Sequence, residues 1–245
     1  MTGSASGGPG NGEASTARTP ALRVDGLSAG YGDALVLSGL SLSVDPGEMV
    51  AVLGRNGAGK TTALLALAGL VPTTAGTVRV GDVDLTAAKP GARVSAGLVS
   101  VPDDRGLFPS LSVAEHFRLI GSSVDEAAAL FPGLAKLAGR RVGACSGGEQ
   151  QQVAVGLGMV RRPKVLCVDE LSMGLAPQVA GELLAGLRTL ADEGDTAVIV
   201  VEQFVDAVLA VADRGLVLSE GRVTHDEPAA ALLADHASLE AAYLG

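Results

Sequence analysis

Gly54-Arg55-Asn56-Gly57-Ala58-Gly59-Lys60-Thr61 is the stretch that decides the fold, because it fits G-x-x-x-x-G-K-[ST] and directly follows the apolar run Met49 to Leu53. A strand, a glycine-rich loop and a helix are therefore expected in that order. In such a loop the backbone N–H groups turn inward around phosphate, the lysine reaches the β- and γ-phosphates, and the threonine hydroxyl suits Mg²⁺. We predict that these residues and the adjoining Thr62 bind a nucleoside triphosphate.

The composition of the chain excludes several classes of protein. Its 245 residues can bury a sizeable core. A formal net charge of -9 and the absence of any large Lys/Arg cluster argue against a nucleic-acid partner. There is no apolar run near the ~20 residues that a membrane-spanning helix needs, no secretory pattern at the N-terminus, and only 2 cysteines. We expect a cytoplasmic protein that does not cross the bilayer.

The chain is expected to consist of a tail followed by one large domain, residues 21–245. Residues 1–20 are almost wholly Gly, Ser, Thr, Ala and Pro, and are predicted to be disordered because they carry too little apolar surface to offset the ordering entropy. Around the phosphate loop, the apolar spacing predicts strands near Leu22 to Leu27, Leu37 to Val44 and Gly76 to Val80, and a helix from Thr62 to Gly69.

Four later apolar runs are short, rich in valine and separated by helical patterns, which is typical of buried parallel strands. Between the first two of them, the stretch from about Phe108 to Val160 is rich in Ala and Leu, with apolar spacings of three and four. We expect a helical subdomain there, at approximately residues 105–160, which Pro109, Pro132 and Gly133 break into short helices. The four runs are Leu98 to Val101, Val165 to Val168, Ala197 to Val201 and Gly215 to Leu218.

Two carboxylates, Asp169 and Glu170, follow the second of these runs directly. A strand that ends in charged turn residues is one interpretation. Together with a phosphate loop, the pair also suggests that Asp169 orders the Mg²⁺ shell and that Glu170 polarises the attacking water. Both functions need charge at the C-terminal end of a strand, where the ligands of open α/β sheets collect.

A second loop of small residues, Ser146, Gly147, Gly148 and Glu149, opens an expected helix that runs to Gly158. It fits an ordinary N-cap, and it also fits a second anion site suited to a γ-phosphate. The segment SGGEQQ resembles the signature of the ATP-binding-cassette (ABC) ATPases, and it stands in that family's order. The resemblance implies an α/β fold: a P-loop NTPase (RecA-like) core with an N-terminal antiparallel β subdomain and an inserted α-helical subdomain.

The resemblance also implies a head-to-tail dimer, in which the signature residues of one subunit close over the ATP of the other. Tyr31 matches the aromatic residue that stacks on adenine, the alternative being a packed core tyrosine. Asp103 stands where a glutamine that contacts Mg²⁺ and water is usual, and Gln203 where a histidine that senses the γ-phosphate is usual. The cofactors implied are ATP and Mg²⁺, with metal ligation by Thr61, Asp169 and Asp103, and with Glu170 and Gln203 as catalytic residues.

Several segments resemble, more specifically, the ATPase subunits of branched-chain amino-acid importers. They are residues 106–113, 149–151, 174–177, 201–203, 212–215 and 242–245. The chain departs from its relatives at Cys145, where leucine is usual before the signature, and in the helix that follows, where Gly156-Leu157-Gly158 replaces Ala-Arg-Ala. The three histidines, His116, His225 and His236, are expected at the surface.

The function implied is that of an importer's ATP-hydrolysing subunit, which couples Mg-ATP binding and hydrolysis to uptake of branched-chain amino acids or similar small polar solutes. The implied partners are a second ABC ATPase subunit, identical or different, transmembrane permease subunits and, indirectly, a substrate-binding protein. The chain would then be peripheral on the inner face of the cell membrane. Two alternatives are a soluble ABC ATPase outside transport and a regulatory subunit with reduced hydrolysis, although Glu170 and Lys60 argue against the second.

Overall fold

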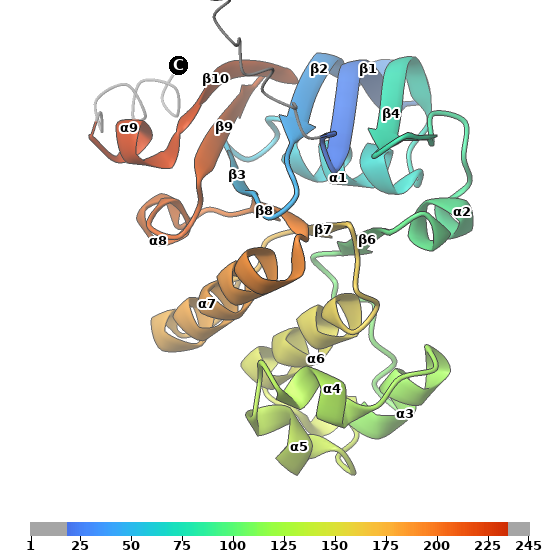
Figure 1. The fold of residues 1–245 in the computed structure, drawn as a ribbon, viewed down its shortest axis with the longest axis vertical. Helices are drawn as coiled ribbons and strands as arrows, with labels where there is room; N and C mark the ends of the chain where they lie inside the picture. The colour runs from blue at the N-terminus through green and yellow to red at the C-terminus, as the bar shows by residue number, and fades with distance from the viewer. Residues whose placement is uncertain (1–18, 235–245) are drawn as a thin grey trace, which may run out of the picture.

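The computed structural model describes residues 19–234, which form two sheets, helices that pack on them and a separate group of helices (Figure 1). The predicted disordered tail lies outside the described residues except for its last two positions, and so do His236 and residues 242–245. No helix within the described range is long and apolar enough to span a membrane.

An antiparallel sheet of four strands, in the order β2-β1-β4-β5, forms the N-terminal β subdomain. Along much of β2, buried residues alternate with more exposed ones, so that one face of the strand packs inward. The three strands predicted in this region are confirmed, and all extend further than predicted. The strands are β1 (Leu22–Tyr31), β2 (Ala34–Val44), β4 (Thr73–Val80) and β5 (Val83–Asp84).

The central sheet has six strands in the order β10-β9-β3-β8-β7-β6, and all except β10 run parallel. Every residue of β3, β7 and β8 is buried, because both faces of the sheet are covered. The four predicted parallel strands are confirmed. The strands are β3 (Met49–Leu53), β6 (Leu98–Val101), β7 (Val165–Val168), β8 (Ala197–Val201), β9 (Arg214–Ser219) and β10 (Arg222–Pro228).

A group of short helices is inserted between β6 and β7, as predicted, and lies at the lower end of the view in Figure 1. Its boundaries at residues 105 and 160 stay a prediction. The insertion contains α3 (Val113–Leu119), α4 (Val124–Ala128), α5 (Gly133–Leu137), a 3-10 turn (Val142–Ala144) and α6 (Gly147–Met159). The other helices are α1 (Lys60–Ala68), α2 (Pro90–Ser95), α7 (Pro177–Gly194), α8 (Val205–Leu209) and α9 (Ala229–Ala234).

Within the insertion, α6 packs closely against its neighbours at Gly156. A Cβ at this position would lie 3.1 Å from the Ala127 Cβ of α4 and 3.2 Å from Leu134 Cδ1 of α5. The missing side chain therefore allows α6 to approach both helices, and α6 continues unbroken to Met159.

His116 of α3 is buried, so the prediction that it lies at the surface is wrong. The backbone N–H of Phe108 donates to His116 Nε2 at 2.9 Å, and Nδ1 lies 2.8 Å from the carbonyl oxygen of Ser112. These two contacts hold the loop before α3 against the helix. His225 lies on β10 and is partly exposed.

Two hydrophobic clusters lie on opposite faces of the central sheet. Met49, Ala51 and Leu53 of β3 belong to the cluster that includes the inserted helices and α7. Val50 and Val52 belong to the cluster that includes β1, β2, β4 and α1. Successive residues of a strand point to opposite faces, so β3 is anchored in both clusters. The phosphate loop begins where this doubly anchored strand ends.

Arg93 of α2 fixes the C-terminal end of α1. Its buried guanidinium donates to the carbonyl oxygens of Ala66 at 2.9 Å and Leu67 at 2.7 Å, and also to those of Thr86 and Ala88. The last carbonyls of a helix carry partial negative charge and lack helical partners, so a cation there stabilises the helix. The helix that follows the phosphate loop is therefore fixed in place from its far end.

Candidate active site

The loop between β3 and α1 has the backbone shape of a phosphate nest. Gly54, Gly57 and Gly59 have φ values of 142°, 83° and 103°. A Cβ at Gly54 would lie 2.3 Å from the carbonyl oxygen of Leu218, so no larger residue fits there. Residues with positive φ let successive N–H groups face one concavity, which attracts anions. This shape is the one that the sequence pattern predicts for binding phosphate.

Lys60 lies against this loop. Its side chain is buried, and Nζ donates hydrogen bonds to the carbonyl oxygens of Gly54 at 2.6 Å and Arg55 at 3.0 Å. Burial lowers the pKa of Lys60, and the charges of Glu170 and Asp169 oppose that change. An ammonium group has three N–H donors. Two of them donate to the loop, which leaves the third for a ligand.

Asp169, directly after β7, is a buried carboxylate with an unsatisfied oxygen. The residue is 3% exposed, and its Oδ1 has no hydrogen-bond partner among the described residues. Burial raises the pKa of Asp169 to about 6; the Thr61 hydroxyl and Lys60 oppose the rise, and Asp103 and Glu170 add to it. A buried carboxylate oxygen without a partner costs free energy unless a cation or donor reaches it.

The residues at this point fit Mg²⁺. This cation takes oxygen ligands and is usually held by one or two carboxylates together with substrate phosphates. The orphaned oxygen of Asp169 and the Thr61 hydroxyl, which hydrogen-bonds to the same carboxylate, are such ligands. Asp103 is exposed and acts on Asp169 through its charge. Its part in binding the metal stays a prediction.

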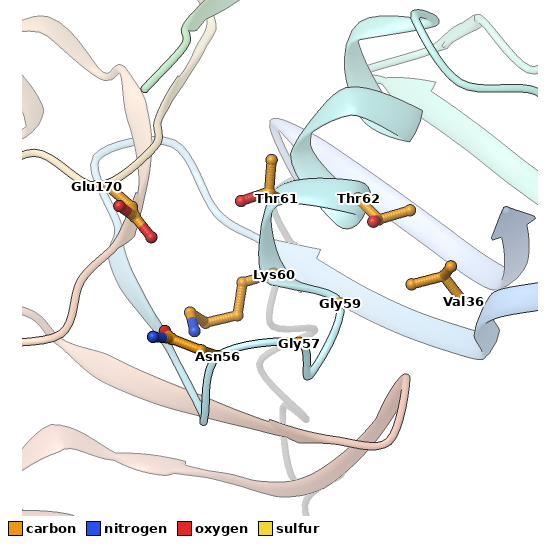
Figure 2. Close-up of a pocket in the computed structure, with 8 residues that line it drawn as sticks. All are labelled: Val36, Asn56, Gly57, Gly59, Lys60, Thr61, Thr62 and Glu170. Atoms are coloured by element: carbon orange, nitrogen blue, oxygen red, sulfur yellow. The ribbon is translucent and has the colours of Figure 1, made fainter. Parts of the chain in front are cut away.

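An open cavity of ≈ 250 Å³ separates the phosphate loop from the turn after β7. In Figure 2, Glu170 lies across this cavity from Lys60 and Thr61. Val36 of β2 also lines the cavity, although the sequence analysis gives it no role, because a valine in a strand carries no local sign of contact with a ligand. The predicted nucleotide-binding residues that line it are Asn56, Gly57, Gly59, Lys60, Thr61 and Thr62.

Glu170 and Gln203 meet although they lie far apart in the sequence. Gln203 Nε2 donates to Glu170 Oε1 at 3.1 Å. The two residues follow β7 and β8, which pair in parallel, so the ends of both strands lie at the same edge of the sheet. Glu170 has a φ of 43°, a conformation that costs a residue other than glycine roughly 1–3 kcal/mol. The structure brings the two predicted catalytic residues together, and their chemical roles stay predictions.

The predicted signature residues form the N-terminus of α6. Ser146 is the N-cap: its Oγ accepts from the Glu149 N–H at 3.3 Å, and Glu149 Oε2 accepts from the Ser146 N–H at 2.7 Å, which is a capping box. The hydrogen bond from the Ser146 N–H lowers the pKa of Glu149. The described residues that line the cavity beside Lys60 include none of the four signature residues.

The remaining predicted nucleotide-binding residues do not line this cavity. Tyr31, at the end of β1, is 51% exposed, which contradicts the alternative of a packed core tyrosine and leaves stacking on adenine as a prediction. Arg55 and Ala58 line a second pocket, together with Ser219 and Glu220.

Two residues near the site are not predicted from the sequence. Glu202 is 1% exposed and accepts two hydrogen bonds from Ser172. Arg105 donates to Gln151 Oε1 at 2.8 Å and to Gln150 Oε1 at 3.1 Å, which joins the turn after β6 to α6. Each contact joins residues at least 30 positions apart, so no local pattern reveals it. The one signal is the similarity of residues 201–203 and 149–151 to importer ATPases.

The chain is similar to known proteins over most of its length. A family model described as "ABC transporter" matches residues 37–172. The high-affinity branched-chain amino acid transport ATP-binding protein BraG of Pseudomonas aeruginosa is 35% identical, with 91% of this chain and 99% of that protein covered. The probable branched-chain amino acid transport ATP-binding protein LivF of Archaeoglobus fulgidus is 31% identical, with 91% and 98% covered. The L-cystine transport system ATP-binding protein TcyN of Escherichia coli is 35% identical, with 88% and 93% covered.

A solved structure has the same fold. The crystal structure of a nucleotide-free ATP-binding cassette from an ABC transporter aligns with a TM-score of 0.79 at 22% identity, with 89% of this chain and 95% of that chain covered. The predicted fold, a P-loop core with an antiparallel β subdomain and a helical insertion, is confirmed by this likeness together with the strand order.

Proposed function

Because the chain belongs to the ABC transporter family and is an ATPase of that family, we propose that it hydrolyses ATP to drive an importer of branched-chain amino acids or similar small polar solutes. The observation that carries the proposal is the hydrogen bond between Gln203 and Glu170, at the cavity lined by the phosphate loop. Glu170 lies across this cavity from Lys60 and Thr61, and the γ-phosphate and its attacking water would lie between them.

The loop and Lys60 hold the triphosphate. The nest of N–H groups and the third donor of Lys60 offset its negative charge. Asp169 and Thr61 are the residues that would hold Mg²⁺, which when bound neutralises charge on the β- and γ-phosphates. These groups bind and orient the substrate, and orientation accounts for much of the catalysis of phosphoryl transfer.

Glu170 acts on the attacking water. The water oxygen forms a bond to the γ-phosphorus, the bond from that phosphorus to the bridging oxygen of ADP breaks, and Glu170 accepts the proton that the water loses. Gln203 has two N–H donors on Nε2. One holds Glu170 Oε1, and the other is available to the γ-phosphate, so Gln203 would align the base with the phosphate that it serves.

A second ATPase subunit supplies the rest of the site. Gly147 and Gly148 are the first two residues of α6. The capping box satisfies the N–H groups of Ser146 and Glu149 and does not use those of the two glycines. These signature residues lie outside the cavity of their own chain. A head-to-tail pair would bring the signature of one chain to the phosphate of the other, and the partner is a copy of this chain or a related ATPase.

Transport needs partners in the membrane. We place the chain at the cytoplasmic face of the cell membrane, bound to permease subunits and served indirectly by a substrate-binding protein. The similarity to BraG and LivF supports branched-chain amino acids as the solutes. The similarity to TcyN, a cystine transport protein, makes cystine the competing solute to test.

The chemistry is tested with Glu170→Gln, which keeps the size of the side chain and removes the base. ATP hydrolysis should fall about 10²–10⁴-fold, because a general base contributes about that factor, while ATP binding persists and a nucleotide-bound dimer accumulates. Glu193→Gln, on the exposed side of α7, makes the same chemical change away from the site and should hydrolyse ATP at the parental rate. If Glu170→Gln hydrolyses ATP at the parental rate, Glu170 is not the general base.

The transport assignment is tested with the chain assembled with its permease subunits in proteoliposomes. We expect uptake of radiolabelled leucine that depends on ATP and is lost in Glu170→Gln. Unlabelled isoleucine and valine should compete and cystine should not. If only cystine competes, the transported solute belongs to the cystine class. If the chain associates with no permease, the importer function is refuted.

A further inference from the structure

Glu202, directly after β8, is a buried carboxylate that the mechanism above does not use. It is 1% exposed, the least exposed charged side chain among residues 19–234. None of the ion pairs in that range includes it. A carboxylate in such a position needs several hydrogen-bond donors to offset the loss of water.

Four donors converge on the Glu202 carboxylate. The Ser172 N–H donates to Oε1 at 2.7 Å, and the Ser172 hydroxyl donates to Oε2 at 2.7 Å. The N–H of Gln203 donates to Oε2 at 2.9 Å and the N–H of Phe204 at 3.4 Å. Both oxygens are therefore occupied, by donors from two separate turns of the chain.

These two turns carry the proposed base, Glu170, and its hydrogen-bond partner, Gln203. Ser172 lies two positions after Glu170 in the turn that follows β7, and Gln203 is the next residue after Glu202 in the turn that follows β8. The side chains of Glu170 and Gln203 meet at 3.1 Å. Hydrogen bonds and the backbone of the two turns therefore close a ring that contains Glu202, Ser172, Glu170 and Gln203.

We propose that Glu202 is a positioning residue for ATP hydrolysis, which holds the turn of Glu170 and the turn of Gln203 as one unit. This inference rests on the proposed function, since it takes Glu170 as the base and Gln203 as its partner. Glu202 itself acts only through these two residues. Its anchor on the Ser172 N–H also restrains the turn in which Glu170 adopts its left-handed conformation, with φ of 43°.

The hydrogen bonds that Glu202 accepts require a carboxylate at this position. An ionised carboxylate only accepts hydrogen bonds, whereas a glutamine amide has one accepting oxygen and a donating NH₂ group. In Glu202→Gln, that NH₂ group would face the N–H of Ser172 in one orientation and the N–H of Gln203 in the other. Either way one turn loses a backbone N–H anchor, although the shape of the side chain is almost unchanged.

The test measures ATP hydrolysis and MgATP binding with the full chain, in the presence and absence of Gln203. Glu202→Gln should lower kcat about 10- to 100-fold, the range typical when a group that orients an active residue is removed. The Kd for MgATP should stay within about twofold, because the phosphate loop is untouched. In a Gln203→Ala background the same substitution should cost less, because the part of its effect that passes through Gln203 is already lost.

Two results would overturn the proposal: a parental kcat for Glu202→Gln, or the same fold loss with and without Gln203. Glu48→Gln removes another largely buried carboxylate, one that pairs with Arg214 outside the site. It should lower stability and leave kcat unchanged, which separates positioning from general destabilisation. Normalising kcat to the number of bound ATP molecules corrects for unfolded protein.

If Glu202→Gln does not fold, Ser172→Ala carries the test, because it removes only the hydroxyl donor and keeps the backbone anchor. A several-fold loss of kcat that becomes smaller in the Gln203→Ala background supports the proposal, and an unchanged kcat refutes it. Glu170→Gln is measured in parallel. Its failure to lower hydrolysis would refute the assignment of Glu170, whereas its success with a parental Glu202→Gln would refute only the present inference.

Discussion

Two loops of small residues open helices in this chain, and their N-termini are built in opposite ways. The phosphate loop leads into α1 through Gly59, whose φ is 103°, with no side-chain cap and no acidic residue in the first turn. The signature leads into α6 through Ser146, with a complete capping box to Glu149. One helix end keeps its N–H groups for a ligand, and the other satisfies part of them within the chain.

The pKa values of the carboxylates near these two helix ends are shifted in opposite directions. Burial raises the pKa of Asp169 beside the phosphate loop to about 6. The N–H of Ser146 lowers the pKa of Glu149 at the signature. A bound cation would therefore stabilise the Asp169 carboxylate. The Glu149 carboxylate is already stabilised by the N-terminus of its own helix. A glycine-rich loop before a helix indicates an anion site only when its own side chains leave the N–H groups open.

The largest effect is expected from Lys60→Ala, which removes the charge that distinguishes the first loop from the second. Affinity for MgATP should fall by about 2–5 kcal/mol, the cost of truncating one partner of a buried charge pair. Isothermal titration with MgATP measures it. Lys89→Ala, an exposed lysine before α2, should bind MgATP as the parent does. If Lys60→Ala binds MgATP with parental affinity, Lys60 does not distinguish the phosphate loop from the signature loop.

The next largest effect concerns Asp169, whose folded pKa of about 6 lies above the value near 4 of the unfolded chain. The folded state holds the proton more tightly, so this group stabilises the fold at low pH and the stabilisation is lost as pH rises through 6. Asp169→Asn should therefore gain on the order of 3 kcal/mol over the parent at pH 8 and about half of that at pH 5.

The measurement for Asp169→Asn is urea unfolding without nucleotide or metal, at pH 5 and pH 8. The same variant should lose Mg²⁺-dependent hydrolysis, since the carboxylate that would hold the cation is gone. An equal change in stability at both pH values would show that the carboxylate is not protonated in this range.

A smaller effect is expected from Ser146→Ala, which makes the signature resemble the phosphate loop by removing its cap. The free energy of unfolding should fall by about 1 kcal/mol. Hydrolysis should also fall while MgATP affinity of the single chain stays the same, because Ser146 would act on the nucleotide of a second subunit.

The chain offers a matched control for Ser146→Ala. Ser112 and Glu115 form a second complete capping box at α3. Ser112→Ala should therefore lose about the same stability, about 1 kcal/mol, and keep the basal hydrolysis rate. If both variants lose hydrolysis equally, the loss reflects capping alone and gives no support to the signature as a nucleotide contact.

Much of the site could be predicted because its signals are contiguous. The phosphate loop is a run of eight residues, and β7 ends directly at Asp169 and Glu170. The parallel strands are continuous apolar runs because both of their faces are buried. Edge strand β10 is different: its sequence RVTHDEP is mostly exposed and reads as a polar turn, so only its pairing with β9 reveals it.

The contacts between distant segments could not be predicted in this way. Glu202 looks like a charged residue that ends a strand, and its role depends on Ser172, 30 positions away. His116 looks like a surface histidine on a short amphipathic helix, and its burial follows from the path of the loop that contains Phe108. Both cases depend on which turns the folded sheet brings together.

The position of β3 in the central sheet has a consequence for how the protein is made. β3 lies between β8 and β9, whose residues follow it by about 150 positions. At the usual 5–20 residues per second of synthesis, the strand that carries the phosphate loop leaves the ribosome roughly 7–30 s before its neighbours. Until then its apolar residues have no partners within the sheet, and a chaperone could shield them. The strand that carries the phosphate loop can therefore complete its pairing in the sheet only after most of the chain has been made.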